Sequence, residues 1–511
     1  MFYFPLMNDP HLHLLVDDHE IQEYINLKRI INKPRKHPEP LIVSDRPWEG
    51  YRTQAWGSVI QEPDGLIRCW YFSFPARKPG EHDVGGYCYA ESRDGIHFEK
   101  PNLGVAEFRG SKDNNLWYPM SPDGKNRIEM DLARRREGLT ALDEKGEPIG
   151  IVNNMDGFTV VRDDDDPDPQ RRYKLIANMQ DHCMWAYADR EGYPDITQEQ
   201  EAHARDVVFG QYLDTSPDGI HWTRKPRRMV PARYGDYMMV TRDERNRRWW
   251  LNERALSLVG RTAAIRTSSD FVNWSPPESI FVNTPEMGFG LQYQWHGGIT
   301  PFNYGNQNLG MLEKWSYAGF GDTCELVSQR EGQRWERVAP GEPFLDIGDE
   351  GAFDRFIIFP THNAPIRIGD ELFIYYTGAG AMTAGSTPDS PGVPMAIGVA
   401  CISLDRFAGL AHSRHTPGEL LTRPMVIEKP NLSLNVEPLK KGEVRLAVLN
   451  MDGSVIPGYE FDASQIDLHE DPCRCAAKWK TRPDLSELIG REVWLKFQIV
   501  GSVLYSYRFA D

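Results

Sequence analysis

Short apolar and aromatic runs alternate with clusters of Asp, Asn, Gly and Pro along most of this chain. From Trp48 onward, a run that opens on polar residues is followed by a turn cluster and then by an aromatic-rich run. Short runs bounded by turn residues predict antiparallel meanders. The expected first strands are residues 53–61, 153–162, 234–241, 294–302 and 361–368, and the expected second strands are residues 68–74, 173–179, 248–253, 309–315 and 371–378.

A turn motif recurs between these meanders. Residues 92–98 (SRDGIHF) return as residues 216–222 (SPDGIHW), and weaker copies follow at 268–274 and 328–335. Such recurrence marks a solenoid or a propeller, and we interpret the motif as the outer hairpin of a blade. Asp94 and Asp218 are then turn residues that cap their own backbone. Five meanders predict a five-bladed β-propeller, a fold that removes exposed sheet edges.

The two ends of the chain differ from this pattern. Alternating runs such as LSLNVEP, EVRLAVLN and EVWLKFQIV follow one another after residue 415 and predict a C-terminal β-sandwich domain. The length of 511 residues agrees with more than one domain. The expected fold class is all-β, with an N-terminal arm packed on the propeller (1–45), a five-bladed β-propeller catalytic domain (46–415) and a β-sandwich domain (416–511).

Charge and composition exclude several partners. A net charge of −16 argues against nucleic acid and against an anionic membrane surface, because both require a basic footprint. No apolar stretch approaches the length of a membrane span, and the first residues do not resemble a secretory leader. Seven scattered cysteines indicate reduced thiols, so we expect a cytoplasmic protein. Cys473-Arg474-Cys475 has no second pair, so we expect no metal site and no cofactor.

The candidate catalytic residues lie where the expected inner strands open. Asp156 and Asp236 occupy the same strand-opening position in consecutive meanders, and Glu350 lies in a loop before the last inner strand. Side chains at these positions can point into the mouth of a propeller funnel. Glycoside hydrolysis needs one protonated carboxyl group as acid and a second, ionised one as nucleophile or base. We therefore predict Asp156, Asp236 and Glu350 as catalytic.

The remaining polar and aromatic residues near these openings suit a small saccharide. Carboxylates, aromatic faces and amides around one funnel, with few cations, are typical of a sugar site. The expected substrate-binding residues are Trp48, Glu49, Arg52, Gln294, His296, Asp354, Arg355 and His362. The glycines that follow His296 indicate tight packing near a ligand or the propeller axis. The predicted activity is hydrolysis of a glycosidic bond in a small saccharide or glycoside, and a homo-oligomer stays open.

Several motifs carry a resemblance over nearly the whole chain. They are LLVDDHEI, PWEG at 47–50, SRDGIHFEKPNLG at 92–104, GSKDNN at 110–115 and the ending at 504–509. With this layout the chain resembles the five-bladed propeller glycoside hydrolases (the invertase-like and arabinanase-like enzymes), and more closely a group of uncharacterised bacterial proteins. The resemblance implies two catalytic Asp and one Glu on successive inner strands. It also implies that Asp354 contacts sugar.

The sequence departs from that pattern at the Glu. The inner strand that should open with Glu opens with Gln294-Trp295-His296 instead. Either the acid comes from a loop, or the chain is a carbohydrate-binding propeller without catalysis. A glycoside phosphorylase or transglycosylase is a further alternative, because Arg52, Arg355, His296 and His362 could form a phosphate site.

Overall fold

The computed structural model describes residues 8–50, 52–74, 86–118, 157–178, 210–223, 227–231, 238–257, 260–281, 293–316, 321–381, 394–412, 416–468 and 473–511. In these ranges the helices are single 3-10 turns at Pro169–Arg171 (η1), Phe461–Ala463 (η3) and Ser486–Leu488 (η4), and the other elements are strands. The all-β prediction is confirmed. No helix among the described residues is long and apolar enough to span a bilayer.

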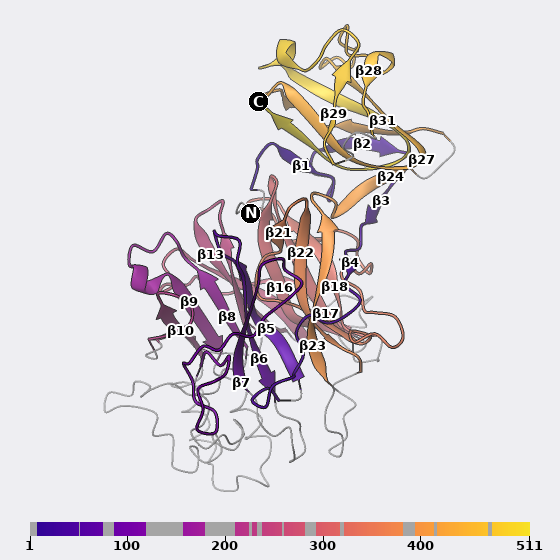
Figure 1. Ribbon diagram of the computed structural model, residues 1–511. Coiled ribbons are helices and arrows are strands. Elements are labelled where there is room, and N and C mark those ends of the chain that lie inside the picture. Colours follow the sequence, from indigo (N-terminus) through magenta and orange to yellow (C-terminus); the bar gives the residue numbers. More distant parts are fainter. Residues whose placement is uncertain are drawn as a thin grey trace.

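Antiparallel meanders form the larger body of the molecule (Figure 1). Three described sheets have four strands each, paired in chain order. They are β8 (Phe158–Arg162), β9 (Tyr173–Asn178), β10 (Gly210–Ser216) and β11 (Arg227–Pro231); β12 (Met238–Asp243), β13 (Arg248–Ser257), β14 (Gly260–Ser268) and β15 (Glu278–Phe281); β16 (Tyr293–Tyr304), β17 (Gln307–Ser316), β18 (Thr323–Gln329) and β19 (Glu336–Arg337).

The first and last meanders are joined in one sheet. Its strands are β5 (Arg52–Gln61), β6 (Ile67–Phe74), β7 (Gly86–Ser92), β20 (Ile357–Pro360), β21 (Ile366–Ile368), β22 (Glu371–Ala379), β23 (Met395–Ser403) and β4 (Arg35–Lys36). The two halves meet through one parallel pair, Met395 with Arg52. Contacts link β5, β8, β12 and β16 in turn, and contacts of β20 with β18 and with β5 close a ring. This arrangement is propeller-like.

One expected strand is misplaced. Residues 361–368 were expected as the last inner strand, but that strand is β20, and only β21 lies within the expected range. The ladder to β22 ends at Pro360, opposite Tyr376. Beyond it the backbone N–H of His362 donates to the carbonyl of Gly57, on the neighbouring strand β5. The chain therefore leaves the ladder to β22 after Pro360 and rejoins it at β21, where Ile366 pairs with Phe373.

The recurring turn motif is confirmed as a structural cap. Asp94 Oδ1 accepts the backbone N–H groups of Ile96 (2.9 Å) and His97 (2.8 Å). Asp218 accepts the equivalent pair, both at 2.8 Å, and so does Asp270 in a degraded copy of the motif. Burial opposes ionisation of Asp218, but these bonds together outweigh it, and at Asp270 the bonds are the main effect, so the pKa values of both carboxyl groups fall to about 2. The motif therefore has a structural role in the hairpins.

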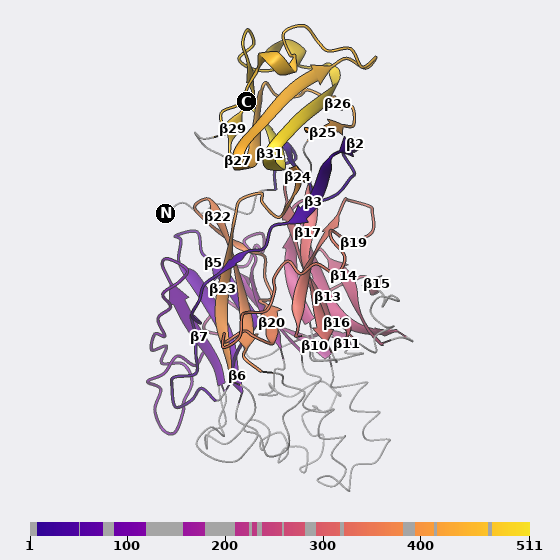
Figure 2. The ribbon, with the colours of Figure 1, turned by 90° about the vertical axis from the view of Figure 1, so that its right-hand side faces the viewer.

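A second, smaller body contains the C-terminal region (Figures 1 and 2). Its described sheet has nine strands: β1 (Leu12–Leu14), β2 (Ile21–Ile25), β3 (Leu27–Ile31), β24 (Ala408–His412), β25 (Gly418–Thr422), β26 (Met425–Val426), β27 (Asn431–Leu449), β29 (Cys475–Ala476) and β31 (Glu492–Ala510). A separate pair joins β28 (Ser464–Gln465) to β30 (Lys478–Trp479). The long strands β27 and β31 face each other along most of their length and bury Leu434, Leu446, Leu495 and Phe497.

The expected N-terminal arm contacts both bodies. On the propeller-like body β4 pairs with β23, and Leu12 and Leu14 pack in one cluster with Phe302 and Tyr304. The strands β1, β2 and β3 also join the C-terminal sheet, through β31, β25 and β24 respectively. That sheet therefore includes most of the arm, and it includes β24, which precedes residue 416.

Candidate functional site

The inner strands β5, β8, β12, β16 and β20 define two ends of the ring. We call the end at which they begin the leading end, and the end at which they finish the trailing end. Hydrogen bonds hold neighbouring inner strands side by side: Val160 N donates to Ser58 Oγ (2.9 Å) and Val240 N donates to Thr159 Oγ1 (3.3 Å). The polar residues that open the expected inner strands therefore belong to the leading end.

The two predicted catalytic aspartates, Asp156 and Asp236, lie outside the described residues. Gln294 and His296 are described only as backbone of β16, so their side chains are also outside what the structure describes. These four stay predictions. Glu350 is described: it is exposed, next to the turn that Ala352 N closes on the carbonyl of Asp349 (3.0 Å). Its loop runs directly into β20, so Glu350 belongs to the leading end.

Asp354 was expected to contact substrate, but its carboxylate is buried and already has protein partners. Oδ2 accepts hydrogen bonds from Lys36 Nζ and from the Tyr376 hydroxyl, both at 2.8 Å. The carboxylate thereby fixes β4 of the arm to the last meander. The neighbouring Arg355 guanidinium lies over the Phe356 ring at 5.0 Å. The geometry around Asp354 favours a structural role.

Glu49 and Trp48 are held in a similar way. The Glu49 side chain is 0% exposed and accepts from Lys100 Nζ (2.7 Å) and from the Tyr71 hydroxyl. Trp48 Nε1 donates to Asn115 Oδ1 at 2.6 Å. Both residues therefore stabilise the first meander. Arg52 opens β5 at the leading end and is half-buried there.

His362 is fully buried where the chain crosses from β20 to β21. Its Nδ1 lies 3.0 Å from the carbonyl oxygen of Phe158, at the start of β8. Burial lowers the pKa of the imidazole to about 4, and the Phe158 carbonyl opposes that shift. The ring is therefore neutral at pH 7. A neutral, buried imidazole cannot act as a cationic ligand of phosphate.

Asp322, a buried carboxyl group at the leading end, is not among the residues predicted from the sequence. It follows the β17–β18 connection, and its residue is 6% exposed. Its backbone N–H donates to the carbonyl of Phe356 (2.8 Å), and its own carbonyl accepts from Ile358 N (3.2 Å). These bonds fix Asp322 beside the first residues of β20. The only visible signal in the sequence was an acidic residue just before a third strand, which usually indicates a turn cap.

The surroundings of Asp322 favour its protonated form. Burial raises its pKa to about 7, against the opposing effects of the Ser316 N–H, which donates to Oδ1 at 2.8 Å, and of the Arg261 charge. Among the described residues Asp322 has no ion-pair partner within 4 Å. The carboxyl group can therefore hold a proton near neutral pH, as a general acid must.

Aromatic and charged side chains lie at the same end of the ring. The Arg261 guanidinium stacks on the Trp315 ring at 4.1 Å, near the ends of β14 and β17 that face this side. Glu253 Oε1 accepts from Arg266 Nε at 2.8 Å, opposite the first residue of β12. The described residues contain no group of three or more His, Cys, Asp or Glu side chains arranged to hold a metal ion.

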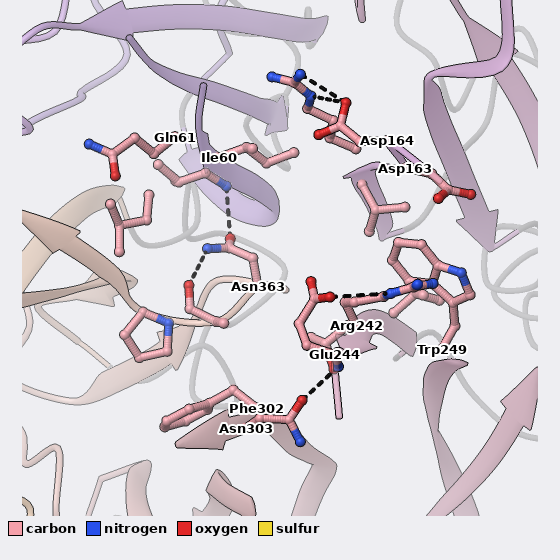
Figure 3. Close-up of a pocket in the computed structure, with 18 of the residues that line it drawn as sticks. Ile60, Gln61, Asp163, Asp164, Arg242, Glu244, Trp249, Phe302, Asn303 and Asn363 are labelled. Atoms are coloured by element: carbon pink, nitrogen blue, oxygen red, sulfur yellow. Dashed lines mark hydrogen bonds and ion pairs between the residues drawn. The ribbon is translucent and has the colours of Figure 1, made fainter. Parts of the chain in front are cut away.

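The trailing end contains a cavity of about 370 Å³ (Figure 3). Its lining comes from the ends of the inner strands and from the chain after His362. Figure 3 shows Ile60, Phe302 and Asn363 on one part of its wall, and Arg242 beside Trp249 on another. Glu350, the one predicted catalytic residue that the structure describes, does not line this cavity.

No family model and no curated protein matches the chain. Among solved structures it is similar to a β-1,2-mannobiose phosphorylase from Listeria innocua, at 11% identity and a TM-score of 0.45, over 75% of this chain and 98% of that chain. It is also similar to a thermostable family-43 glycoside hydrolase, at 12% identity and a TM-score of 0.42, over 71% of this chain and 94% of that chain. At these identities and TM-scores the likenesses carry no argument about chemistry.

Proposed function

We propose that this protein is a glycoside hydrolase that cleaves a small saccharide or glycoside at the leading end of its ring. The observation that carries the proposal is Asp322, a buried carboxyl group whose pKa is raised to about 7 beside the start of an inner strand. Glycosidic oxygen is a poor leaving group until it is protonated, so a carboxyl group that stays protonated near neutral pH is the first requirement of the reaction.

The second requirement is an ionised carboxylate on the opposite side of the scissile bond. Glu350 is exposed to solvent on the loop that leads into β20, at the same end as Asp322. Asp156 and Asp236, predicted from their strand-opening positions, complete the set of candidates. We assign Asp322 as the general acid and one of these three as nucleophile or base.

The same proposal includes five blades for the ring, a β-sandwich for the C-terminal body and a cytoplasmic location. The sheet that joins the first and last meanders divides at the single Met395–Arg52 pair into two blades, which with the three four-stranded sheets make five. The strand β4 then supplies the outer edge of the last blade, so the beginning of the chain closes the ring. The C-terminal body is proposed as a β-sandwich, and the location of the protein as cytoplasmic.

A phosphorylase is the competing activity. Its proposed phosphate site loses one member, because His362 is buried and neutral. Hydrolysis is therefore the better supported reaction. Carbohydrate binding without catalysis does not require a carboxyl group that stays protonated near neutral pH at the leading end.

The test is a panel of aryl glycosides assayed with and without inorganic phosphate. We expect turnover without phosphate and a loss of kcat/KM of about 10²-fold or more in Asp322→Asn. The loss should be smaller for a 2,4-dinitrophenyl glycoside, whose leaving group needs no proton. Asp349→Asn, on an exposed residue at the same end, is the matched control and should keep full activity.

Three results would contradict the proposal. Turnover only with phosphate would establish the phosphorylase, and saccharide binding without turnover would establish the binding protein. Equal loss for good and poor leaving groups in Asp322→Asn would show that Asp322 is not the acid.

A further inference from the structure

A small cavity of about 60 Å³ lies at the joint between the ring and the C-terminal body. The ring contributes Arg367 of β21 and Asp405, which follows β23, and the C-terminal body contributes residues of β27 and β31. The cavity is well above the about 15 Å³ that one water needs. It is far below the about 300 Å³ at which pockets for drug-sized molecules begin. It therefore suits a single small ion or group rather than a sugar ring.

Three arginine side chains line this cavity: Arg367, Arg474 and Arg508. Arg474 Nη2 donates to Asp370 Oδ1, and Arg508 Nε donates to Asp9 Oδ2, both at 2.7 Å. Each of these bonds fixes a guanidinium group beside the cavity and uses one of its five N–H donors. The planar fork of arginine matches the oxygens of phosphate and carboxylate groups. The lining therefore favours an oxyanion over a cation.

The long strands of the C-terminal sheet bring hydroxyl groups to the same place. Ser506 and Arg508 are two residues apart in β31, and their cross-strand partners in β27 are Asn435 and Ser433. Residues in this register share one face of the sheet. Ser506 is 1% exposed, and its hydroxyl makes no hydrogen bond to the residues that the structure describes. Because a buried hydroxyl without a partner costs free energy, a ligand that accepts its hydrogen bond is favoured.

Asp405 is the carboxyl group that an anion in this cavity would meet. Its residue is 9% exposed, and Oδ1 accepts from the Tyr304 hydroxyl at 2.7 Å. Burial raises the pKa of Asp405, against the effects of that bond and of the Arg508 and Arg367 charges. The neutral form is thereby favoured, and a neutral carboxyl group can donate a hydrogen bond. The other carboxylate of the lining, Asp370, is already paired with an arginine.

We propose that this cavity binds a tetrahedral oxyanion of the phosphate or sulfate type, as the free ion or as the phosphate group of a small ester. The arginine forks and the Ser506 hydroxyl donate hydrogen bonds to its oxygens. Because Arg367 belongs to the ring and Arg508 to β31, the anion bridges the two bodies and stabilises their joint. The site is independent of the proposed hydrolysis, since it contains neither Asp322 nor Glu350.

The test is isothermal titration of the full chain with sodium sulfate and with sodium phosphate at constant ionic strength. We expect one saturable site per chain. Ser506→Val adds apolar volume to the cavity without changing its charge, so sulfate binding should weaken by about 10-fold or more. Arg474→Gln, on the protein surface, should weaken it several-fold. Arg445→Gln is the matched control: this half-exposed arginine of β27 pairs with Glu443, and its loss should leave binding unchanged.

Glucose 6-phosphate distinguishes the two sources of the group. Binding that matches inorganic phosphate and falls equally in Ser506→Val indicates an ester, whereas exclusion of the sugar phosphate indicates the free ion. Absence of saturable binding to the wild-type chain, in titration and in thermal unfolding scans with sulfate, would overturn the proposal. So would equal binding by the wild type, Ser506→Val and Arg474→Gln, because the anion would then lie elsewhere.

Discussion

The titrations of Asp322 and His362 should make the free energy of unfolding depend on pH in opposite directions. In the wild type the two effects largely cancel. In the folded chain burial raises the pKa of Asp322 from 3.8 to about 7. Between these values the folded chain holds a proton that the unfolded chain has released, so the free energy of unfolding falls as pH rises. At 1.36 kcal/mol per pKa unit the full effect is about 4 kcal/mol.

His362 acts in the other direction. Burial lowers its pKa from 6.5 to about 4, so in this window the unfolded chain holds a proton that the folded chain lacks. Its contribution to stability is therefore present above pH 6.5 and is lost as pH falls towards 4, and it amounts to about 3 kcal/mol. Over the shared window the two slopes nearly cancel.

Single substitutions should separate the two slopes. In Asp322→Asn the stability should rise more steeply with pH than in the wild type, and the variant should be the more stable protein above pH 7. In His362→Gln the stability should fall with pH over the same window. The assay is guanidinium chloride denaturation, followed by tryptophan fluorescence, in half-unit steps from about pH 4 to about pH 8.

Each variant's profile of unfolding free energy against pH is compared with that of the wild type. This comparison removes the contributions of the other titrating groups, which are the same in all three proteins. The double variant should restore a profile parallel to that of the wild type below pH 6.5. If Asp322→Asn and the wild type have parallel profiles from about pH 4 to about pH 8, Asp322 is not held protonated by burial. The assignment of the general acid would then fail with it.

Two further predictions concern the packing of the ring. Lys36→Met should lower the free energy of unfolding by about 3 kcal/mol in denaturant melts, because it leaves the buried Asp354 carboxylate without its cation. The control Lys33→Met removes an exposed ion pair and should lower it by under about 1 kcal/mol. Equal losses in the two variants would refute the prediction. Gly298→Ala should lower the free energy of unfolding by at least about 2 kcal/mol in the same measurement, because φ is +144° and a Cβ would lie 2.2 Å from Asn252 Nδ2. The control Gly332→Ala, where the space around the Cβ is open, should lower it by less.

The sequence located the meanders because their signals are local. Residues 92–98 and 216–222 form the same turn, since each Asp accepts the backbone N–H groups two and three residues later. Such bonds depend on neighbours in the sequence, so a repeated motif predicts a repeated structure. The Gly298 position also agreed with its sequence interpretation as a site of tight packing, here against Asn252.

The position of the N-terminal arm could not be predicted from local sequence patterns. Strands β1, β2 and β3 have partners that lie almost 400 residues or more away in the sequence, as in the pairing of Leu12 with Arg508. No local pattern specifies which of two bodies such a strand joins. The last inner strand was misplaced for a related reason, because the backbone of His362 bonds to Gly57 of β5, about 300 residues earlier in the sequence, and not to β22.

Asp322 could not be identified from the sequence, because its raised pKa depends on burial without a close cation among the described residues. Other buried carboxylates of the described chain have a cation close by: Glu49 has Lys100, Asp354 has Lys36, Glu62 has Arg68, Asp243 has Arg248 and Glu325 has Arg337. In those places a charge is buried with its counter-charge, and the pair holds meanders together. Asp322 accepts a backbone N–H, and the charge of Arg261 only partly offsets its burial.

Asp405 shows that an unpaired buried carboxyl group is not sufficient by itself. Burial raises its pKa as well, but its Oδ1 accepts from the Tyr304 hydroxyl at 2.7 Å, and the next residue, Arg406, donates to Asn435 of β27 at 2.8 Å. That carboxyl group fixes the joint between the two bodies. Asp322 instead lies at the leading end of the ring, next to the start of β20. The combination of a retained proton and a position at the leading end is what distinguishes a candidate acid from a structural carboxyl group.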